Sequence, residues 1–139
     1  MRVVLDTNIL VSGIISPAGP PAQILTALRQ GRVVAVMSAA TLAELEAVLQ
    51  RPRFRPYFVR AGVTPAALLN ELRLQADIVT PAPSVLAIRD ERDRPFLDLM
   101  GTTPPPEYFV TGDHDFEARQ YSGVPVVSAS LFVQLLKQL

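Results

Sequence analysis

The sequence predicts an α/β fold: a three-layer α/β/α arrangement around a central, mainly parallel sheet. Segments with strand character alternate along the chain with segments of helix character, as in parallel sheets with helical crossovers. The expected strands are continuous apolar runs, which is typical of strands buried on both faces. The chain has 139 residues, of which 49% are apolar, so we expect a single folded domain over residues 1–139.

Five short strands are expected where apolar and β-branched residues follow one another. The first strand ends at Asp6 and the fourth ends at Gly112 and Asp113, so a polar residue closes each of them. The second is rich in valine, and the third and last are brief. In chain order these strands cover residues 3–5, 32–37, 78–80, 108–111 and 125–127.

Helices are expected between the strands, and their ends carry sequence signals. Pro21 stands near the start of one helix, and Gly31 stops it. Ser38 can cap the next helix, and Thr64 followed by Pro65 is a cap with proline at the first helical position. The helices cover residues 22–30, 39–50, 54–61, 65–76, 93–100 and 130–139, and residues 9–15 form a helix or a turn.

Composition excludes several classes of protein. The absence of cysteine excludes disulfides, thiolate nucleophiles and iron–sulfur clusters. Lys137 is the only lysine, and the chain has no Gly-x-x-x-x-Gly-Lys or Gly-x-Ser-x-Gly motif, which disfavours P-loop enzymes and serine hydrolases. The net charge is zero, and no apolar run approaches the roughly 20 residues needed to cross a bilayer. We therefore expect a cytoplasmic protein with no membrane contact.

Carboxylates follow the predicted strands. Asp6 and Asp113 each end a strand, so both are expected at the carboxyl edge of the sheet, where α/β proteins bind ligands. Glu44 lies in the second turn of the helix capped by Ser38, which begins at that edge. Asp93 opens a later helix, and the sequence alone leaves open at which edge that helix begins.

A cluster of four carboxylates predicts a cation, because the charges repel one another unless a cation neutralises them. With no cysteine and one histidine in the chain, oxygen ligands favour Mg²⁺ or Mn²⁺ over zinc or copper. Such a site can activate water and offset the charge that develops on a phosphate. The chemistry indicated is metal-assisted hydrolysis of a phosphodiester.

Several residues near these acids compete with them. Glu46 flanks the same apolar stripe as Glu44, and helix geometry does not choose between the two. Asp90 is the alternative to Asp93. Asp115 is either an additional ligand or a helix cap. Thr7, Asn8 and Thr111 are candidates for contact with substrate or with the ligands, and His114 is expected to be a solvated loop residue rather than a general base.

Five segments, taken in order, resemble the motifs of the PIN-domain ribonucleases. The resemblance covers the whole chain, and the four acidic residues stand at matching places. The matching segments are residues 3–10 (VVLDTNIL), 43–45 (AEL), 90–97 (DERDRPFL), 110–116 (VTGDHDF) and 126–128 (VVS).

The resemblance implies a PIN-like fold whose pocket binds Mg²⁺ or Mn²⁺ through Asp6, Glu44, Asp93 and Asp113. It also implies that Asp93 faces the pocket and that the protein cuts single-stranded RNA. Within the family, the chain most resembles the small toxins of type II toxin–antitoxin systems, which are usually dimeric and inhibited by a cognate antitoxin. Residues 100–107 (MGTTPPPE) depart from the family pattern and predict a shortened helix with a stiff loop beside the pocket.

An arginine-rich stretch follows the second acid. Arg51, Arg53 and Arg55 are candidates for RNA contact, because guanidinium groups bind phosphate well. The rings of Phe54, Tyr57 and Phe58 in the same stretch have the i, i+3 and i+4 spacing of a buried stripe, so core packing or an interface with a second copy or an antitoxin is expected for them.

The main alternative is a PIN-like scaffold with little catalysis that binds RNA or a protein partner. The presence of all four acids favours the enzyme.

Overall fold

The computed structural model describes residues 1–112, 116 and 118–139. In this part of the chain a six-stranded sheet has the strand order β3-β2-β1-β4-β6-β5. Neighbouring strands are parallel except for β5, which pairs antiparallel with β6. The strands are β1 (Arg2–Leu5), β2 (Val34–Met37), β3 (Asp77–Ile78), β4 (Tyr108–Val110), β5 (Gln120–Tyr121) and β6 (Val124–Val127).

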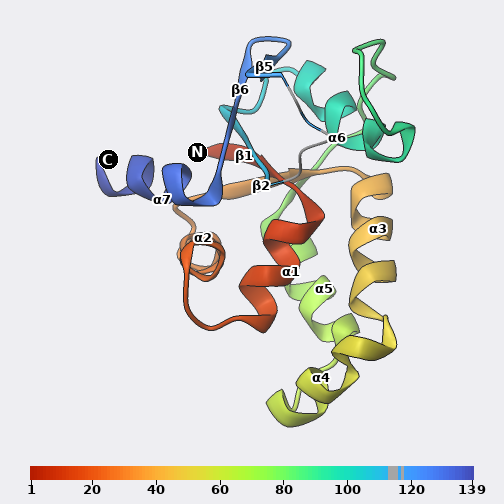
Figure 1. Ribbon diagram of the computed structural model, residues 1–139, viewed down its shortest axis with the longest axis vertical. Coiled ribbons are helices and arrows are strands. Elements are labelled where there is room, and N and C mark those ends of the chain that lie inside the picture. The colour runs from red at the N-terminus through yellow and green to blue at the C-terminus, as the bar shows by residue number, and fades with distance from the viewer. Residues whose placement is uncertain (113–115, 117) are drawn as a thin grey trace.

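Helices lie on both faces of the sheet (Figure 1), which confirms the predicted fold class. The α-helices are α1 (Thr7–Ile15), α2 (Pro20–Arg29), α3 (Ala39–Leu49), α4 (Arg55–Ala61), α5 (Pro65–Gln75), α6 (Arg94–Asp98) and α7 (Ala129–Lys137). Short 3₁₀ turns precede or follow some of them: η1 (Pro52–Phe54), η2 (Glu91–Asp93) and η3 (Leu99–Gly101).

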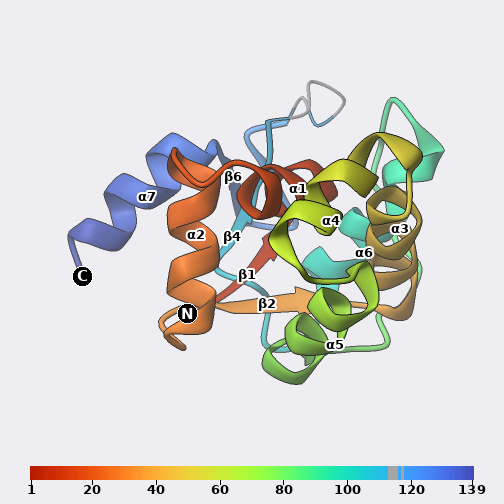
Figure 2. The same ribbon diagram turned by 90° about the horizontal axis from the view of Figure 1, so that it is seen from below.

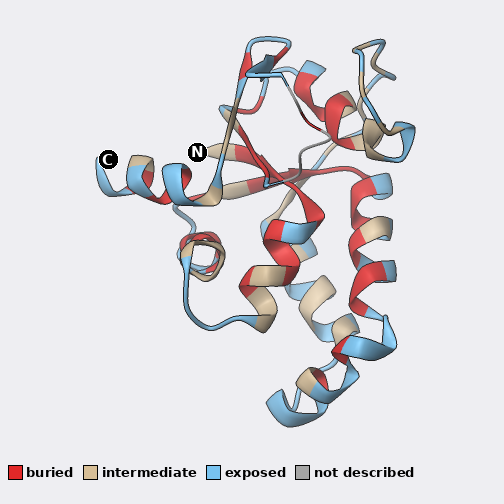
Figure 3. Cartoon of the chain, in the orientation of Figure 1, coloured by how far each residue is buried: buried red, intermediate tan, exposed pale blue. Residues whose placement is uncertain are grey.

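Alternate residues of β1 point into two separate cores, as expected for side chains of period two in a strand. Val3 and Leu5 pack in the larger core with α1, α2, α3 and α7. Val4 packs in the smaller core with α6 and η3. Figure 2 looks onto the larger helical layer, where α2 and α7 lie side by side, and Figure 3 shows that buried residues concentrate along the sheet.

The order in which the chain adds strands to the sheet reverses at β1. From β1 the sheet grows through β2 to β3 on one side, and then through β4 to β6 on the other. In doubly wound sheets the point where the order reverses, at the carboxyl ends of the strands, is where ligands bind. Here that point lies between the ends of β1 and β4, next to Asp6 and Thr111.

The predicted caps explain where two helices begin. The Ser38 side chain accepts a hydrogen bond from the Thr41 backbone N–H at 3.2 Å, and the Thr41 hydroxyl accepts one from the Ser38 N–H at 2.9 Å. This reciprocal pair starts α3 and satisfies donors that would otherwise lack a partner. The Thr64 hydroxyl accepts from the Ala67 N–H at 3.1 Å and starts α5.

Two expectations about the second half of the chain need correction. The helix expected over residues 93–100 is divided into α6 and the 3₁₀ turn η3. The stiff loop that follows it lies at the amino edge of the sheet and not beside the pocket. There the Glu107 N–H donates to the Arg2 carbonyl at 2.8 Å, and the Arg2 guanidinium donates to the Pro104 carbonyl at 2.6 Å.

Within the described ranges, no single helix has both the length and the apolar character needed to span a membrane. Helices α1 and α2 pass that test only as a pair, and they are bent by 92° relative to each other.

Candidate active site

Asp6 lies at the junction of β1 and α1 and is held from two sides. Its side chain is the N-cap of α1 and accepts the Asn8 N–H at 2.6 Å. Its other oxygen accepts the Thr111 hydroxyl at 2.5 Å, which links the carboxyl ends of the paired strands β1 and β4. Asp6 is only 4% exposed, so these hydrogen bonds replace water as the partners of a buried carboxylate.

Glu44 extends from α3 toward the same junction. The buried Thr7 hydroxyl donates to Glu44 Oε2 at 2.7 Å, which joins the first turn of α1 to the second turn of α3. Glu46, the alternative considered from the sequence, is exposed. Of these two residues, Glu44 is the one that lies next to the β1–α1 junction.

Asp93 ends η2 and stands at the N-cap position of α6. Its backbone N–H donates to the Asp90 carbonyl at 3.0 Å. The Asp90 carboxylate is engaged elsewhere: it accepts the Arg92 N–H at 2.9 Å and pairs with the Arg92 guanidinium at 2.8 Å. These hydrogen bonds from Arg92 lower the pKa of Asp90 below its usual value. Asp90 is thus part of the turn, and Asp93 is the residue that reaches the cleft.

The three acidic residues line one cleft of about 250 Å³, which we call the carboxylate cleft. The helix α6 begins at this edge, which answers the question that the sequence left open for Asp93. The complete lining is Asp6, Thr7, Asn8, Glu44, Val48, Arg51, Asp93, Phe96 and Phe116.

The donor types in the carboxylate cleft fit a hard divalent cation, because carboxylate and hydroxyl oxygens are the ligands preferred by Mg²⁺ and Mn²⁺. Within residues 1–112, 116 and 118–139, no three acidic or histidine side chains already lie close enough together to hold one ion. Asp113, Asp115 and His114 lie outside the described residues.

The remaining candidates take different places. Thr111 donates its hydroxyl hydrogen to Asp6, one of the proposed ligands, as expected for a residue that contacts the ligands. Asn8 is exposed at the rim of the cleft. Arg51 lines the cleft and is exposed, while Arg53 and Arg55 line two neighbouring grooves.

The ring stripe packs as its spacing predicts. Phe54 and Phe58 are buried in the larger core. The Tyr57 hydroxyl donates to the Ile14 carbonyl at 2.5 Å and so ties α4 to α1. The Arg53 guanidinium lies 4.7 Å from the centre of the Phe54 ring, and this cation–π contact restricts the conformations of the Arg53 side chain.

Sequence reasoning missed the apolar part of the cleft and one polar residue beside it. Phe96 and Phe116 line the cleft and make ring contact with each other, with centroids 6.2 Å apart. Both lie within segments that resemble family motifs, so their place in those motifs was the available signal. Arg94 follows Asp93 directly and bonds Glu91; this pairing lowers the pKa of Glu91 and raises that of Arg94.

Comparison with known proteins agrees with this architecture. The chain is 27% identical over 115 residues to an uncharacterized protein of Methanocaldococcus jannaschii, covering 83% of this chain and 72% of the relative. Residues 2–115 match the family described as PIN domain. PIN domains are generally nucleases, and these typically use divalent metals. Since the match covers most of the sequence, including the β1, α3 and α6 segments that line the cleft, the chain belongs to the PIN domain family.

Proposed function

We propose that this chain is a divalent-metal-dependent endoribonuclease that cleaves single-stranded RNA. The observation that carries the proposal is the shared cleft of Asp6, Glu44 and Asp93, which come from three separate elements. In the proposal these residues and Asp113 hold Mg²⁺ or Mn²⁺, with Asp115 as a candidate further ligand. Membership in a family of nucleases supports the reaction class.

The chain's own groups hold the carboxylates in place for this chemistry. Thr111 donates to Asp6, and Thr7 donates to Glu44, so a buried hydroxyl orients each of these two carboxylates. Thr111 directly follows β4, and Thr7 is the first residue of α1, which follows β1. The pairing of β1 with β4 therefore helps to set the orientation of both carboxylates. A divalent ion bound there would supply Lewis-acid activation of water and neutralise charge on the phosphate.

The arginines beside the cleft support an RNA substrate. Arg51 lines the carboxylate cleft, where it can contact a phosphate of the bound strand. Arg53 and Arg60 line a groove of about 550 Å³ that also includes Asn8 and so adjoins the cleft. Arg55 lines a separate groove of about 610 Å³, whose lining also includes Arg51. No acidic residue is among the described residues that line these two grooves.

We further propose that the protein acts as the toxin of a toxin–antitoxin pair, with a cognate antitoxin as partner, and that it forms a homodimer or a higher homo-oligomer. The resemblance of its motifs to the small toxin-like branch supports this biological role. Induced expression should then arrest bacterial growth, and the Asp6→Asn variant should not. Growth arrest by both forms to the same extent would contradict a toxic nuclease.

The direct test combines metal binding with RNA cleavage. We expect calorimetric titration with Mn²⁺ to give binding by the wild type, and Asp6→Asn, Glu44→Gln, Asp93→Asn and Asp113→Asn each to weaken it strongly. The same variants should lose cleavage of a labelled single-stranded RNA pool. Glu46→Gln is the matched control, because Glu46 lies on α3 but is exposed. Full metal-dependent cleavage by the Asp6 and Asp113 variants would refute the proposal.

A binding module without catalysis is the second candidate. It is favoured by one observation: acidic residues line a common cleft, but within the described part of the chain no three acidic or histidine side chains are grouped closely enough to hold one ion. If RNA binds in the presence of a chelator while Mn²⁺ neither binds nor supports cleavage, this second candidate is correct.

A further inference from the structure

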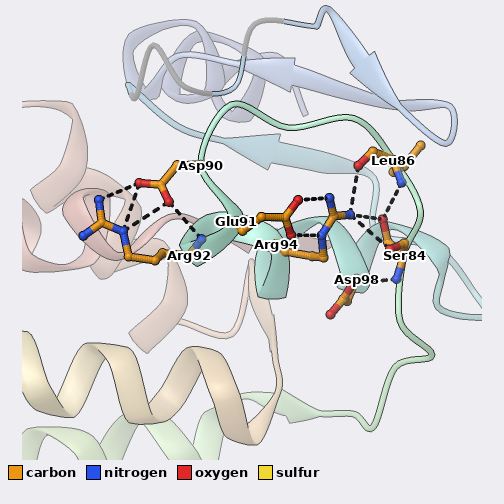
Figure 4. Close-up of polar contacts among 7 residues, drawn as sticks. All are labelled: Ser84, Leu86, Asp90, Glu91, Arg92, Arg94 and Asp98. Carbon is orange, nitrogen blue, oxygen red and sulfur yellow. Dashed lines mark hydrogen bonds and ion pairs between the residues drawn. The ribbon is translucent and has the colours of Figure 1, made fainter.

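Arg94, the residue after Asp93, donates hydrogen bonds to a carboxylate and to two backbone carbonyls (Figure 4). Its Nε and Nη2 atoms donate to the two carboxylate oxygens of Glu91 at 2.5 and 2.6 Å. Its Nη1 atom donates to the backbone carbonyls of Ser84 and Leu86 at 3.0 and 2.8 Å. We call this set of contacts the Arg94 clamp. The Arg94 side chain is 23% exposed, so it is largely shielded from water.

The clamp holds a segment that has no regular structure of its own. Residues 80–90 form neither helix nor strand, and they connect the edge strand β3 to η2. Besides Arg94, the Asp98 carboxylate accepts the Ser84 N–H at 2.7 Å, and the Ser84 hydroxyl accepts the Leu86 N–H at 3.0 Å. Helix α6 therefore holds the segment through the Ser84 and Leu86 carbonyls, which accept from Arg94, and through the Ser84 N–H, which donates to Asp98.

Asp93 lies between two fixed points of the backbone. On one side, the Asp90 carbonyl accepts the Asp93 N–H, and the Asp90 carboxylate closes the turn on Arg92. On the other side, Arg94 is anchored through its guanidinium to Ser84 and Leu86. Helix α6 has only five residues, so its own hydrogen bonds give little rigidity. Contacts made by the residues on either side of Asp93 therefore contribute to the backbone position from which its carboxylate extends.

We propose that Arg94 is a positioning residue that fixes Asp93 in the geometry required for metal binding. This inference rests on the proposed function, since it needs Asp93 to be a metal ligand. Arg94 is not among the residues that line the carboxylate cleft, so it acts through Asp93 and not on the substrate.

The clamp requires arginine rather than any cation. A planar guanidinium can donate to a carboxylate along one edge and to backbone carbonyls from its remaining nitrogen at the same time. The ammonium of lysine is a single point of donation and cannot span Glu91, Ser84 and Leu86 together. Lysine at this position should therefore restore the charge without restoring the position of Asp93.

Metal selectivity distinguishes positioning from simple stabilisation. Mg²⁺ demands a nearly ideal octahedral arrangement of oxygen ligands, and Mn²⁺ is bound by a wider range of ligands. A displaced Asp93 should weaken Mg²⁺ binding more than Mn²⁺ binding. A loss of overall stability without displacement would lower the melting temperature and leave the ratio of the two dissociation constants unchanged.

The experiment measures Mn²⁺ and Mg²⁺ affinity of the full chain by calorimetry, with circular dichroism to verify folding. We expect Arg94→Gln to weaken Mn²⁺ binding about tenfold, the lower end for residues that orient metal ligands, and to weaken Mg²⁺ binding more. Arg94→Lys should be nearly as defective. Ser84→Ala leaves the clamp's backbone carbonyls in place and removes the hydroxyl that accepts from the Leu86 N–H and, at 3.5 Å, from Arg94 Nη1. It should therefore show a smaller effect in the same direction even if Arg94→Gln folds poorly. Arg29→Gln, which removes a surface pair with Glu71, is the matched control.

A double-mutant cycle completes the test. If Arg94 acts through Asp93, the Arg94→Gln change should not weaken Mn²⁺ binding any further in an Asp93→Asn background. Equal losses in both backgrounds, or an unchanged ratio of Mg²⁺ to Mn²⁺ affinity in folded Arg94 and Ser84 variants, would overturn the inference. Absence of Mn²⁺ binding by the wild type would instead contradict the proposed function, so the two failures are distinguishable.

Discussion

The two walls of the carboxylate cleft are built differently. Asp6 and Glu44 extend from regular elements, the β1–α1 junction and α3, and buried hydroxyls orient both of them. Asp93 extends from a 3₁₀ turn before a five-residue helix, and charged side chains hold the backbone around it. The first wall is fixed by secondary structure and burial. The second wall is fixed by hydrogen bonds that lie partly in solvent.

This difference suggests how the cleft responds to a cation. A wall held by buried hydrogen bonds keeps its shape with or without metal. A wall held by partly exposed ion pairs and hydrogen bonds is less rigid, so a bound ion reduces its motion more. Metal binding should therefore rigidify the Asp93 wall more than the Asp6 and Glu44 wall.

The largest predicted effect tests that asymmetry directly. Mn²⁺ at a hundredfold excess over its dissociation constant should raise the free energy of unfolding by about 2.7 kcal/mol, because it binds only the folded chain. Hydrogen exchange should slow more in residues 90–93 than in α3 when Mn²⁺ is added. Equal slowing of exchange in both walls would contradict this asymmetry.

The next effect concerns the hydroxyl that joins α1 to α3. Thr7→Val removes the donor to Glu44 and keeps the shape, so it should lower the free energy of unfolding by about 1.5 kcal/mol. Urea denaturation measures this change. Thr7→Ser should retain most of the stability. Thr26→Val, at an exposed position on α2, is the control and should change the stability by less than about 0.5 kcal/mol.

Two helix caps provide a matched pair with a smaller effect. Ser38→Ala and Thr64→Ala each remove an N-cap, and each should cost about 1 kcal/mol in thermal or urea denaturation. Only Ser38 starts the helix that carries Glu44, so only Ser38→Ala should also weaken Mn²⁺ binding. If both variants weaken Mn²⁺ binding equally, the cap at the start of α3 does not help to position Glu44 in the cleft.

The smallest effect concerns the arginines near the Glu44 wall. Arg51→Gln should weaken binding of a single-stranded RNA a few-fold and reduce the slope of log affinity against log salt by about 0.7, the loss of one phosphate contact. Binding is measured by fluorescence anisotropy in the presence of a chelator, so that cleavage does not interfere. Arg73→Gln, on the exposed surface of α5, should leave both quantities unchanged.

Much of the fold could be predicted because its signals are local. Ser38 and Thr64 cap helices as expected, and the apolar runs form the inner strands. The antiparallel β5 was not predicted, because its two residues, Gln120 and Tyr121, do not form an apolar run. Its signal was the pair Ser122 and Gly123, whose φ angles of 50° and 81° suit the tight turn of a hairpin.

The site could be predicted only in part. Asp6, Glu44 and Asp93 share a cleft, as the motifs implied. The Arg94 clamp could not be predicted, because two of its acceptors are backbone carbonyls of an irregular segment ten and eight residues away. Backbone carbonyls carry no sequence signal, so a contact of this kind becomes visible only in three dimensions.

The outer strands of the sheet restrict how copies of this chain can associate. Both edge strands, β3 and β5, contain two residues, and Pro81 and Pro83 follow soon after β3. A strand from another molecule would find few free backbone groups to pair with along either edge, which also protects the sheet from aggregation. Self-association of the kind proposed above would therefore join helices to helices and leave each sheet confined to its own chain.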